Sequence, residues 1–396
     1  MQIKKLVLYF VGWKILLFVF LFLAIQILPL QLPFLGGGIS NYLQNPYIFS
    51  WLNFDGEHYL DIAISGYKPL TYFYFPLYPL TVRLLAFFFS KSFNSYIYSG
   101  LFISHFAFFL GLLGLIKLIR LDYSEKIVRT TVLLLLLFPT SFYFGSFYTE
   151  SLFFALATWS IYFARKGNWI AAGLIGALSS ATRIIGVALF PTLVVEALIQ
   201  AKENKIRLTL PIFSSFLVML GIITYATLLR GSVGDPLAFF HSLNEVFGEQ
   251  RSQVFIMLPQ VFYRYIFKIL PSINYRYFPA VFTTWLEFVV AVGFTLLLVV
   301  GFTNWLSSYL PKIKILKDYK LRESYLIYFL IGYIIPTLSG SFSSLPRYVL
   351  VLFPAFILMA IFFSKLNPVL RTYIFIISFV LLGVATALFT RGYWLA

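Results

Sequence analysis

The chain has 396 residues, of which 60% are hydrophobic and 11% are charged, whereas about 25% of the residues of an ordinary soluble domain are charged. The formal net charge of +16 comes from 30 lysines and arginines against 14 acids, but no compact basic patch with interleaved aromatic residues appears, so we expect no nucleic-acid partner. Cysteine is absent, which excludes disulfides, thiolate catalysis and cysteine-ligated metals.

Eleven apolar segments follow one another along the chain, and they predict an all-α polytopic membrane protein with about 11 transmembrane helices. In chain order they are 7–29, 97–119, 128–147, 149–165, 169–182, 184–200, 209–230, 281–306, 323–339, 347–364 and 372–390. The first is too long for the apolar region of a signal peptide, and no small-residue cleavage site follows it, so we expect it to be retained. No long polar stretch remains for a soluble domain, so residues 1–396 read as one integral membrane domain.

Basic residues gather in five turns between these segments, and they predict the orientation of the chain. The turns carry Lys117, Arg120, Lys126 and Arg129; Arg165 and Lys166; Lys202, Lys205 and Arg207; Lys312, Lys314, Lys317, Lys320 and Arg322; and Lys365 and Arg371. All five face the cytoplasm if the N-terminus is cytoplasmic and each segment crosses once, as the positive-inside rule requires. The acids in these turns, and Glu196 near one of them, read as solvated or snorkelling partners of the basic side chains.

This orientation requires that a further apolar stretch, 75–89, does not cross the membrane. Arg83 within it, and the two prolines at its start, suit a helix that lies at the outer interface. Residues 30–96 then form a first extracytoplasmic loop that contains this helix, and residues 231–280 form a second. Both loops are rich in tyrosine and phenylalanine, so we expect them to lie against the membrane.

Three acids and a histidine lie close together in the first loop: Asp55, Glu57, His58 and Asp61. In a helix, Glu57 and Asp61 share a face, and Asp55 is placed to cap the helix start. A cap with a solvated face is therefore one reading, and a functional carboxylate cluster is another. Metal ligation is a third, although the spacing matches no standard metal motif.

Three further charged residues are expected at the same side of the membrane. Glu150 opens a helix at the outer edge, where the helix dipole favours a carboxylate. Arg183 lies at the break between two short segments, and a buried arginine there needs an anion, which Glu150, Asp55 or a ligand phosphate would supply. Arg347 begins a helix on this side, either as an interfacial anchor or as a second cation of a site.

Carboxylates and arginines at one side of a membrane suit chemistry on a lipid-linked phosphate. Arginine binds phosphate oxygens in a bidentate manner, and a carboxylate accepts the proton of an attacking hydroxyl. The chain has neither a P-loop nor a Rossmann glycine motif, and it has no soluble domain to hold a sugar nucleotide. An activated donor would therefore reach the site through the membrane or from the outer side.

The chain resembles the PIG-V family, the second mannosyltransferases of GPI-anchor synthesis and their prokaryotic relatives. The resemblance is carried by Phe54-Asp55-Gly56-Glu57-His58-Tyr59-Leu60-Asp61-Ile62-Ala63, Gly66-Tyr67, Phe75-Pro76-Leu77-Tyr78-Pro79-Leu80, Phe138-Pro139-Thr140-Ser141, Tyr148-Thr149-Glu150-Ser151-Leu152-Phe153, Ser180-Ala181-Thr182-Arg183-Ile184-Ile185-Gly186 and Leu345-Pro346-Arg347-Tyr348. These matches span residues 54 to about 355 in the family's order. Phe54 departs from the pattern, since the family usually has tryptophan there.

The resemblance implies the GT-C glycosyltransferase fold and a polyprenyl-phosphate sugar donor, usually mannose, that is used on the extracytoplasmic face. It implies inversion at the anomeric carbon, with Asp55 as the base that deprotonates the acceptor hydroxyl and with arginines that stabilise the leaving phosphate. Glu150 would position Arg183 or contact the sugar, and no cofactor or metal is implied. The substrate-binding residues implied are Glu57, His58, Asp61, Glu150, Arg183, Arg347 and Tyr348.

The resemblance does not identify the acceptor, which is a glycolipid, a cell-wall polymer, a protein or a phospholipid headgroup. A transporter or flippase of a lipid-linked sugar is the alternative, because the same arginines would grip a phosphate without chemistry. Transporters usually contain internal repeats and helices broken at the midplane. The sequence has no visible repeat, and its acids cluster in an outer loop, which favours the enzyme. A scaffold subunit without chemistry is a third reading.

Overall fold

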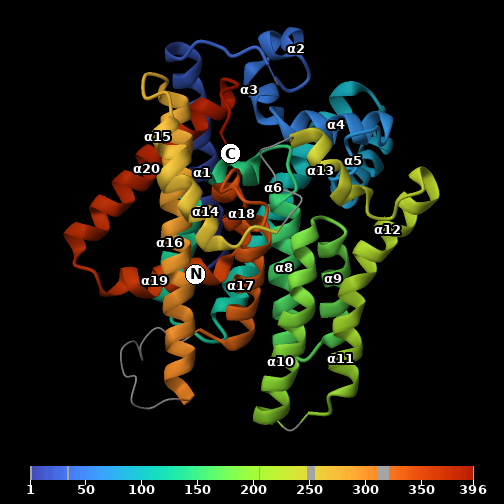
Figure 1. Ribbon diagram of the computed structural model, residues 1–396, viewed down its shortest axis with the longest axis vertical. Coiled ribbons are helices and arrows are strands. Elements are labelled where there is room, and N and C mark those ends of the chain that lie inside the picture. The colour runs from blue at the N-terminus through green and yellow to red at the C-terminus, as the bar shows by residue number, and fades with distance from the viewer. Residues whose placement is uncertain (1, 34, 205, 248–254, 310–320, 396) are drawn as a thin grey trace.

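The computed structural model describes residues 2–33, 35–204, 206–247, 255–309 and 321–395, and all regular structure in these ranges is helical (Figure 1). The α-helices are α1 Ile3–Ile27, α2 Ile39–Gln44, α3 Pro46–Phe49, α4 Asp55–Ser65, α5 Leu77–Phe87, α6 Phe93–Ile119, α7 Glu125–Leu136, α8 Glu150–Arg165, α9 Trp169–Ser180, α10 Leu189–Asn204, α11 Thr209–Phe216, α12 Leu220–Val233, α13 Ala238–Phe247, α14 Leu258–Arg264, α15 Leu270–Ser272, α16 Phe278–Tyr309, α17 Glu323–Thr337, α18 Leu345–Tyr348, α19 Phe353–Lys365 and α20 Pro368–Thr390.

Several of these helices are long and apolar enough to cross a membrane, so the chain is a multi-pass membrane protein. Within the described ranges six stretches qualify, namely Ile3–Ile27, Phe93–Ile119, Ile184–Glu203, Thr209–Val233, Phe278–Ser307 and Pro368–Thr390. The pair Leu345–Val351 and Phe353–Lys365, bent by 85°, is a seventh candidate. These seven match seven of the eleven predicted spans. The other four correspond to helices of 12 to 16 residues, so the count of 11 crossings is not established by helix length.

The prediction of one continuous helix over 128–147 is wrong. Helix α7 ends at Leu136, and the chain continues as a buried 3₁₀ segment over Ser141–Gly145. Pro139 explains the break, because the residue before a proline is disfavoured in the α conformation. The Ser141 hydroxyl donates to the Leu136 carbonyl at 2.6 Å, which satisfies one of the orphan carbonyls at the helix end. Non-helical backbone at this depth is tolerated because it is buried in protein.

Helix α5 is the element predicted to lie at the interface, and its 11 residues are too few to span a bilayer. Its Arg83 donates to the carbonyls of Ala63 and Ile62, at 2.7 and 3.1 Å from Nε and Nη2 respectively. These carbonyls are at the C-terminal end of α4, where a cation is favoured by the helix dipole. Arg83 therefore ties α5 to α4, the helix that begins with Asp55.

Four of the five predicted basic turns contribute to one cluster at one end of the helix bundle. Arg165 at the end of α8 binds Asp122 at 2.6 Å, and it lies 3.3 Å from Glu196 of α10. Arg322, which precedes α17, binds Glu196 at 2.8 Å and Glu203 at 3.0 Å. The rest of the fourth turn, 310–320, lies outside the described residues.

Glu196 is not a snorkelling side chain, because its side chain is fully buried. It accepts hydrogen bonds from Gln200 and Ser324, both at 2.7 Å, in addition to those from Arg322. A buried carboxylate is tolerated only when it is paired and hydrogen-bonded. Glu196 therefore joins α10 to α17 at the basic end of the bundle.

Candidate active site

Four charged side chains of alternating sign meet at the other end of the bundle. Asp55 Oδ2 lies 2.6 Å from Arg347 Nη1, and Arg347 Nε lies 3.4 Å from Glu150 Oε1. The same Glu150 oxygen accepts a hydrogen bond from Arg183 Nη1. The formal charges of the four groups cancel, so the row is balanced before an anionic substrate enters.

The position of this row relative to the basic cluster follows from α8. Glu150 is the first residue of that helix and Arg165 is the last. Sixteen residues of helix are roughly 24 Å long. The candidate site and the basic turns therefore lie at opposite ends of the bundle (Figure 1).

Asp55 is fixed by the residues that precede it. Asn53 is fully buried, and its side chain accepts from the Gly36 amide and donates to the Phe389 carbonyl, both at 2.9 Å. Phe54 has φ +59° and ψ −120°, a region that non-glycine residues rarely occupy and that persists only where the surroundings impose it. This turn directs the first carboxylate of α4 toward Arg347.

Phe54 keeps the aromatic character of the family's tryptophan position. Its ring lies 5.8 Å from that of Phe389 and 5.4 Å from that of Trp394, in the second case edge to face. The ring thus packs between the start of α4 and the end of the chain, and it supports the backbone from which Asp55 projects.

Arg183 lies in the connection between α9 and α10, as the break between the predicted segments indicated. Its backbone is extended, with φ −156°, and its guanidinium donates to Thr149 Oγ1 at 3.2 Å in addition to Glu150. Glu150 is 1% exposed, and its place at the N-terminus of α8 is favoured by the helix dipole. Of the two protein carboxylates considered for Arg183, Glu150 is the one that it contacts.

Arg347 projects from α18, and its surroundings are aromatic. Its guanidinium carbon lies 5.1 to 5.5 Å from the ring centroids of Tyr143, Tyr148 and Tyr348, distances at which a cation is attracted to the ring face. The Thr140 hydroxyl donates to the Pro346 carbonyl at 2.6 Å, which joins α18 to the segment before α8. Arg347 is therefore a buried member of the site and not an interfacial anchor.

A further buried acid, Glu287, supports the segment that precedes α18, and the sequence did not lead us to it. Glu287 of α16 is 5% exposed, and it accepts a hydrogen bond from the Tyr265 hydroxyl at 2.7 Å. The same hydroxyl accepts from the Phe342 amide at 3.2 Å. Ser344, two residues further on, has φ +64°. This arrangement holds the strained turn that leads to Arg347.

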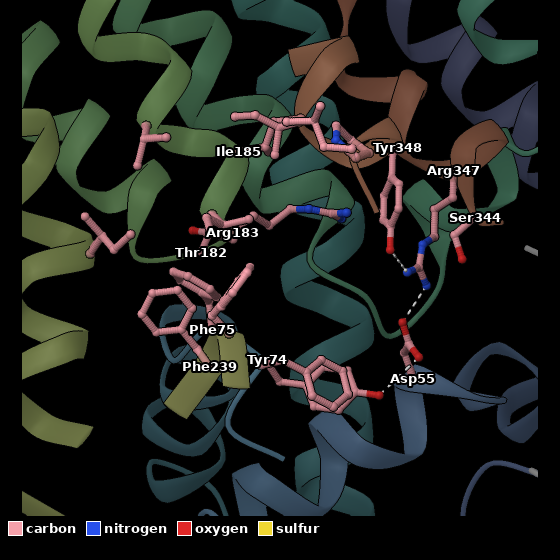
Figure 2. Close-up of a pocket in the computed structure, with 18 of the residues that line it drawn as sticks. Asp55, Tyr74, Phe75, Thr182, Arg183, Ile185, Phe239, Ser344, Arg347 and Tyr348 are labelled. Carbon is pink, nitrogen blue, oxygen red and sulfur yellow. Dashed lines mark hydrogen bonds and ion pairs between the residues drawn. The ribbon is translucent and has the colours of Figure 1, made fainter. Parts of the chain in front are cut away.

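The charged row opens onto a cavity of about 570 Å³ that is largely apolar. Asp55, Arg183, Arg347 and Tyr348 line it (Figure 2). Glu150 is not among the lining residues, which favours a role in positioning the two arginines over direct sugar contact. Tyr74 also lines the cavity, and its hydroxyl donates to Asp55 Oδ1 at 3.1 Å.

Glu57, His58 and Asp61 do not line this cavity. His58 is exposed and stacks on the Tyr74 ring at a centroid distance of 5.3 Å. Asp61 binds Lys68 at 2.7 Å on the surface, and Glu57 is partly exposed. The structure thus brings Asp55, Glu150, Arg183, Arg347 and Tyr348 together and leaves the other three candidates on the outer faces of α4.

The electrostatic environment distinguishes the two acids at the start of α4. Burial alone would raise the pKa of Asp55, but the charge and hydrogen bond of Arg347, assisted by His58 and Tyr74, leave it below its usual value. Burial raises the pKa of Glu57 above its usual value. Asp55 is therefore held ionised at neutral pH, as a base must be.

Metal ligation was the third reading of the acidic cluster. Within the described ranges no three His, Asp or Glu side chains come together in an arrangement that would hold a metal ion. Asp55 instead uses its two oxygens for Arg347 and Tyr74.

Comparisons with known proteins agree with this architecture. A family model described as mannosyltransferase (PIG-V) matches residues 3–267. The crystal structure of ArnT from Cupriavidus metallidurans bound to undecaprenyl phosphate is similar, with a TM-score of 0.51 and 15% identity over 99% of this chain and 77% of that chain. The apo structure of the same protein has a TM-score of 0.48 and 13% identity, over 98% of this chain and 76% of that chain. No curated protein matches the chain. The fold is the GT-C fold that the family resemblance implied.

Proposed function

Because the chain belongs to the mannosyltransferase (PIG-V) family and is a membrane glycosyltransferase, we propose that it transfers mannose from a polyprenyl-phosphate donor to an acceptor hydroxyl, with inversion. The observation that carries this proposal is the row Asp55, Arg347, Glu150, Arg183 at the wall of a largely apolar cavity. It combines a carboxylate base with two cations, beside space for a lipid.

The donor phosphate is proposed to bind between Arg183 and Arg347, which both line the cavity. Their guanidinium groups offer the forked donors that suit phosphate oxygens. The prenyl chain would lie against the apolar part of the lining, which includes Ile184, Ile185, Val187, Met219, Ile222, Ile335 and Leu338. That ArnT was crystallised with undecaprenyl phosphate supports a donor of this class.

The reaction is proposed to be a single in-line displacement. The acceptor hydroxyl would replace the Tyr74 hydroxyl on Asp55 Oδ1, give its proton to that carboxylate, and form the new bond to the anomeric carbon. The bond from that carbon to the phosphate oxygen breaks, and its electron pair stays on the phosphate. Arg183 and Arg347 stabilise this charge, and preorganised donors of this kind are often the largest catalytic term.

The other residue roles are part of the proposal. Glu150 positions both arginines, and Tyr348 contacts the substrate from the cavity wall. That Glu57, His58 and Asp61 bind substrate stays a prediction, and any effect they have on Asp55 would pass through Tyr74. The scheme uses no metal or other cofactor.

The site is proposed to face the extracytoplasmic side, and the N-terminus the cytoplasm. The support is the cluster of basic turns at the opposite end of the bundle, since such turns mark the cytoplasmic side. Residues 30–96 and 231–280 would then be the two extracytoplasmic loops, with α5 at the interface.

The test is transfer from radiolabelled polyprenyl-phosphate mannose by purified wild type and Asp55→Asn, with chelator present in a parallel series. We expect transfer by wild type and a loss of at least about 10³-fold in the variant, with the protein still folded and with binding of polyprenyl phosphate no weaker than in wild type. Glu125→Gln, at the basic end, is the control and should behave as wild type. Equal transfer by wild type and Asp55→Asn would remove Asp55 from the mechanism. Transfer from glucose or galactose donors in place of mannose would revise the sugar.

A further inference from the structure

The segment that follows α20 turns back into the site, and hydrogen bonds from several parts of the fold fix it. The Tyr143 hydroxyl donates to the Leu395 carbonyl at 2.6 Å, and the Thr283 hydroxyl donates to the Trp394 carbonyl at 3.1 Å. Leu395 and Tyr393, on either side of Trp394, are almost completely buried, at 1% and 6% exposure. The backbone of this segment is therefore held as firmly as that of a core element.

Trp394 differs from its neighbours because its side chain remains 47% exposed while it lines the cavity. A tryptophan that serves only as packing would be buried, as Trp51 and Trp13 are at 1% and 4%. A tryptophan that serves only as a membrane anchor would face the lipid headgroups. Trp394 shares a cavity with Asp55 and two arginines, a position that neither packing nor membrane anchoring alone requires.

The position of Trp394 within the cavity is given by its contact with Phe54. The two rings meet edge to face at 5.4 Å, and Phe54 directly precedes Asp55. Arg183 enters the cavity from a different wall than Asp55 (Figure 2). Trp394 thus lies against the residue that precedes the base, on the side of the cavity where the group that the base deprotonates must bind.

We propose that Trp394 is a stacking platform for a pyranose ring of the acceptor and so determines how the acceptor is held beside Asp55. The wall is assigned to the acceptor because Asp55 is the base, so this inference rests on the proposed function. The face of an indole ring is electron-rich, and one face of a pyranose ring presents polarised C–H bonds that are attracted to it. A flat ring on a rigid backbone also loses little side-chain entropy when it binds a ligand.

The test is equilibrium binding of octyl α-mannoside, octyl α-glucoside and octyl β-galactoside to the full-length protein in phosphatidylcholine nanodiscs, measured by calorimetry. Octane-1,2-diol is the probe with the same chain and no ring. Trp394→Ala should weaken binding of at least one pyranoside about five-fold or more, and Trp394→Phe less than that. Trp285→Ala is the matched control, because Trp285 is 40% exposed on α16 and does not line the cavity.

The outcomes separate the inference from the proposed function. A loss restricted to pyranosides and to the Trp394 variants supports the platform. Equal affinities in wild type and Trp394→Ala, or an equal loss for the diol, overturn it. Donor hydrolysis without acceptor, compared in wild type and Asp55→Asn, tests the proposed function alone. If hydrolysis depends on Asp55 but pyranoside binding is the same with and without Trp394, the proposed glycosyltransferase activity is retained and the proposed role of Trp394 is rejected.

Discussion

Asp55 and Arg347 form an ion pair of 2.6 Å although 292 positions separate them in the sequence. Each lies in the first turn of a helix that begins directly after a residue of positive φ: Phe54 precedes α4, and Ser344 precedes α18. Strained backbone of this kind is concentrated at functional sites, where the surrounding structure imposes it. Each member of the pair therefore projects from a turn that other parts of the fold support. The backbone of each turn brings its side chain into position for the ion pair.

The acid limb of the pH profile should report Asp55. Because Arg347 holds the pKa of this buried carboxyl below its usual value of about 4, activity should persist as the pH falls to that value and disappear below it. In Arg347→Gln, burial raises the pKa of Asp55 and the charge of Arg347 no longer opposes this. The acid limb of the residual kcat/KM should therefore move to higher pH. The same linkage makes the pair contribute fully to stability above about pH 4, and the contribution is lost as the pH falls through the lower folded value.

Arg183→Gln is the control for this shift. It removes a cation that does not contact Asp55, so it should lower the rate and leave the acid limb in place. A limb that moves equally in both variants would assign the titration to another group.

Glu150→Gln should lower kcat and tighten the binding of the anionic donor. The change gives the row a net charge of +1, which favours a phosphate, while Arg183 and Arg347 lose the negative charge that both approach. We expect a fall of about ten-fold or more in kcat and a several-fold lower dissociation constant for polyprenyl phosphate at low salt, where charge effects are least screened. Weaker donor binding would show that Glu150 is needed to position the two arginines for the phosphate, in addition to balancing their charge.

Tyr265→Phe should destabilise the turn before Arg347. It removes the hydroxyl that donates to Glu287 and accepts from the Phe342 amide, and leaving a buried polar group unpaired costs about 1–3 kcal/mol. A lower midpoint of thermal unfolding, with kcat reduced more than the KM for donor, is the expected result. Tyr263→Phe, two residues earlier on α14 and 54% exposed, should match wild type in both measurements.

Gly186→Ala should disturb the turn that carries Arg183. A Cβ at this position would lie 2.6 Å from backbone atoms of Ser179 and Ser180, so the backbone must shift. We expect a loss of both stability and transfer activity. Gly293→Ala is the counterpart, since a Cβ there meets nothing within 4 Å and alanine favours a helix by about 1 kcal/mol. Its midpoint of unfolding should stay the same or rise.

The sequence predicted the long helices well, because a continuous apolar run of about 20 residues leaves few alternatives in a bilayer. It failed over 128–147, where the apolar character of the run was followed although Pro139 marks a helix boundary within it. It also interpreted Glu196 as a snorkelling side chain. The arginines that pair with the buried carboxylate come from α8 and from the residue before α17, which are distant from Glu196 in the sequence.

The charged residues of the site could be predicted because charged residues are rare in this sequence. Asp55, Glu150, Arg183 and Arg347 stand out in an apolar sequence, but their pairing depends on contacts between distant segments. Glu287 gave a signal that was missed, since it is the only charged residue of the predicted span 281–306, and an ionisable group there is a functional candidate by default. Tyr74 and Trp394 gave none, because aromatic residues are common throughout both of their neighbourhoods.

The hydrogen bond from Asn53 to the Phe389 carbonyl places a temporal constraint on biosynthesis. The first loop cannot reach its final position until α20 has left the ribosome and entered the bilayer. At 5–20 residues per second, synthesis of the intervening chain takes roughly 20–70 s. For most of that interval the nascent chain contains Asp55 without Arg347, so the ion pair of the site cannot yet form. We therefore expect the site to assemble only after α20 is in place, and a deletion that begins within α20 should produce an inserted but inactive protein.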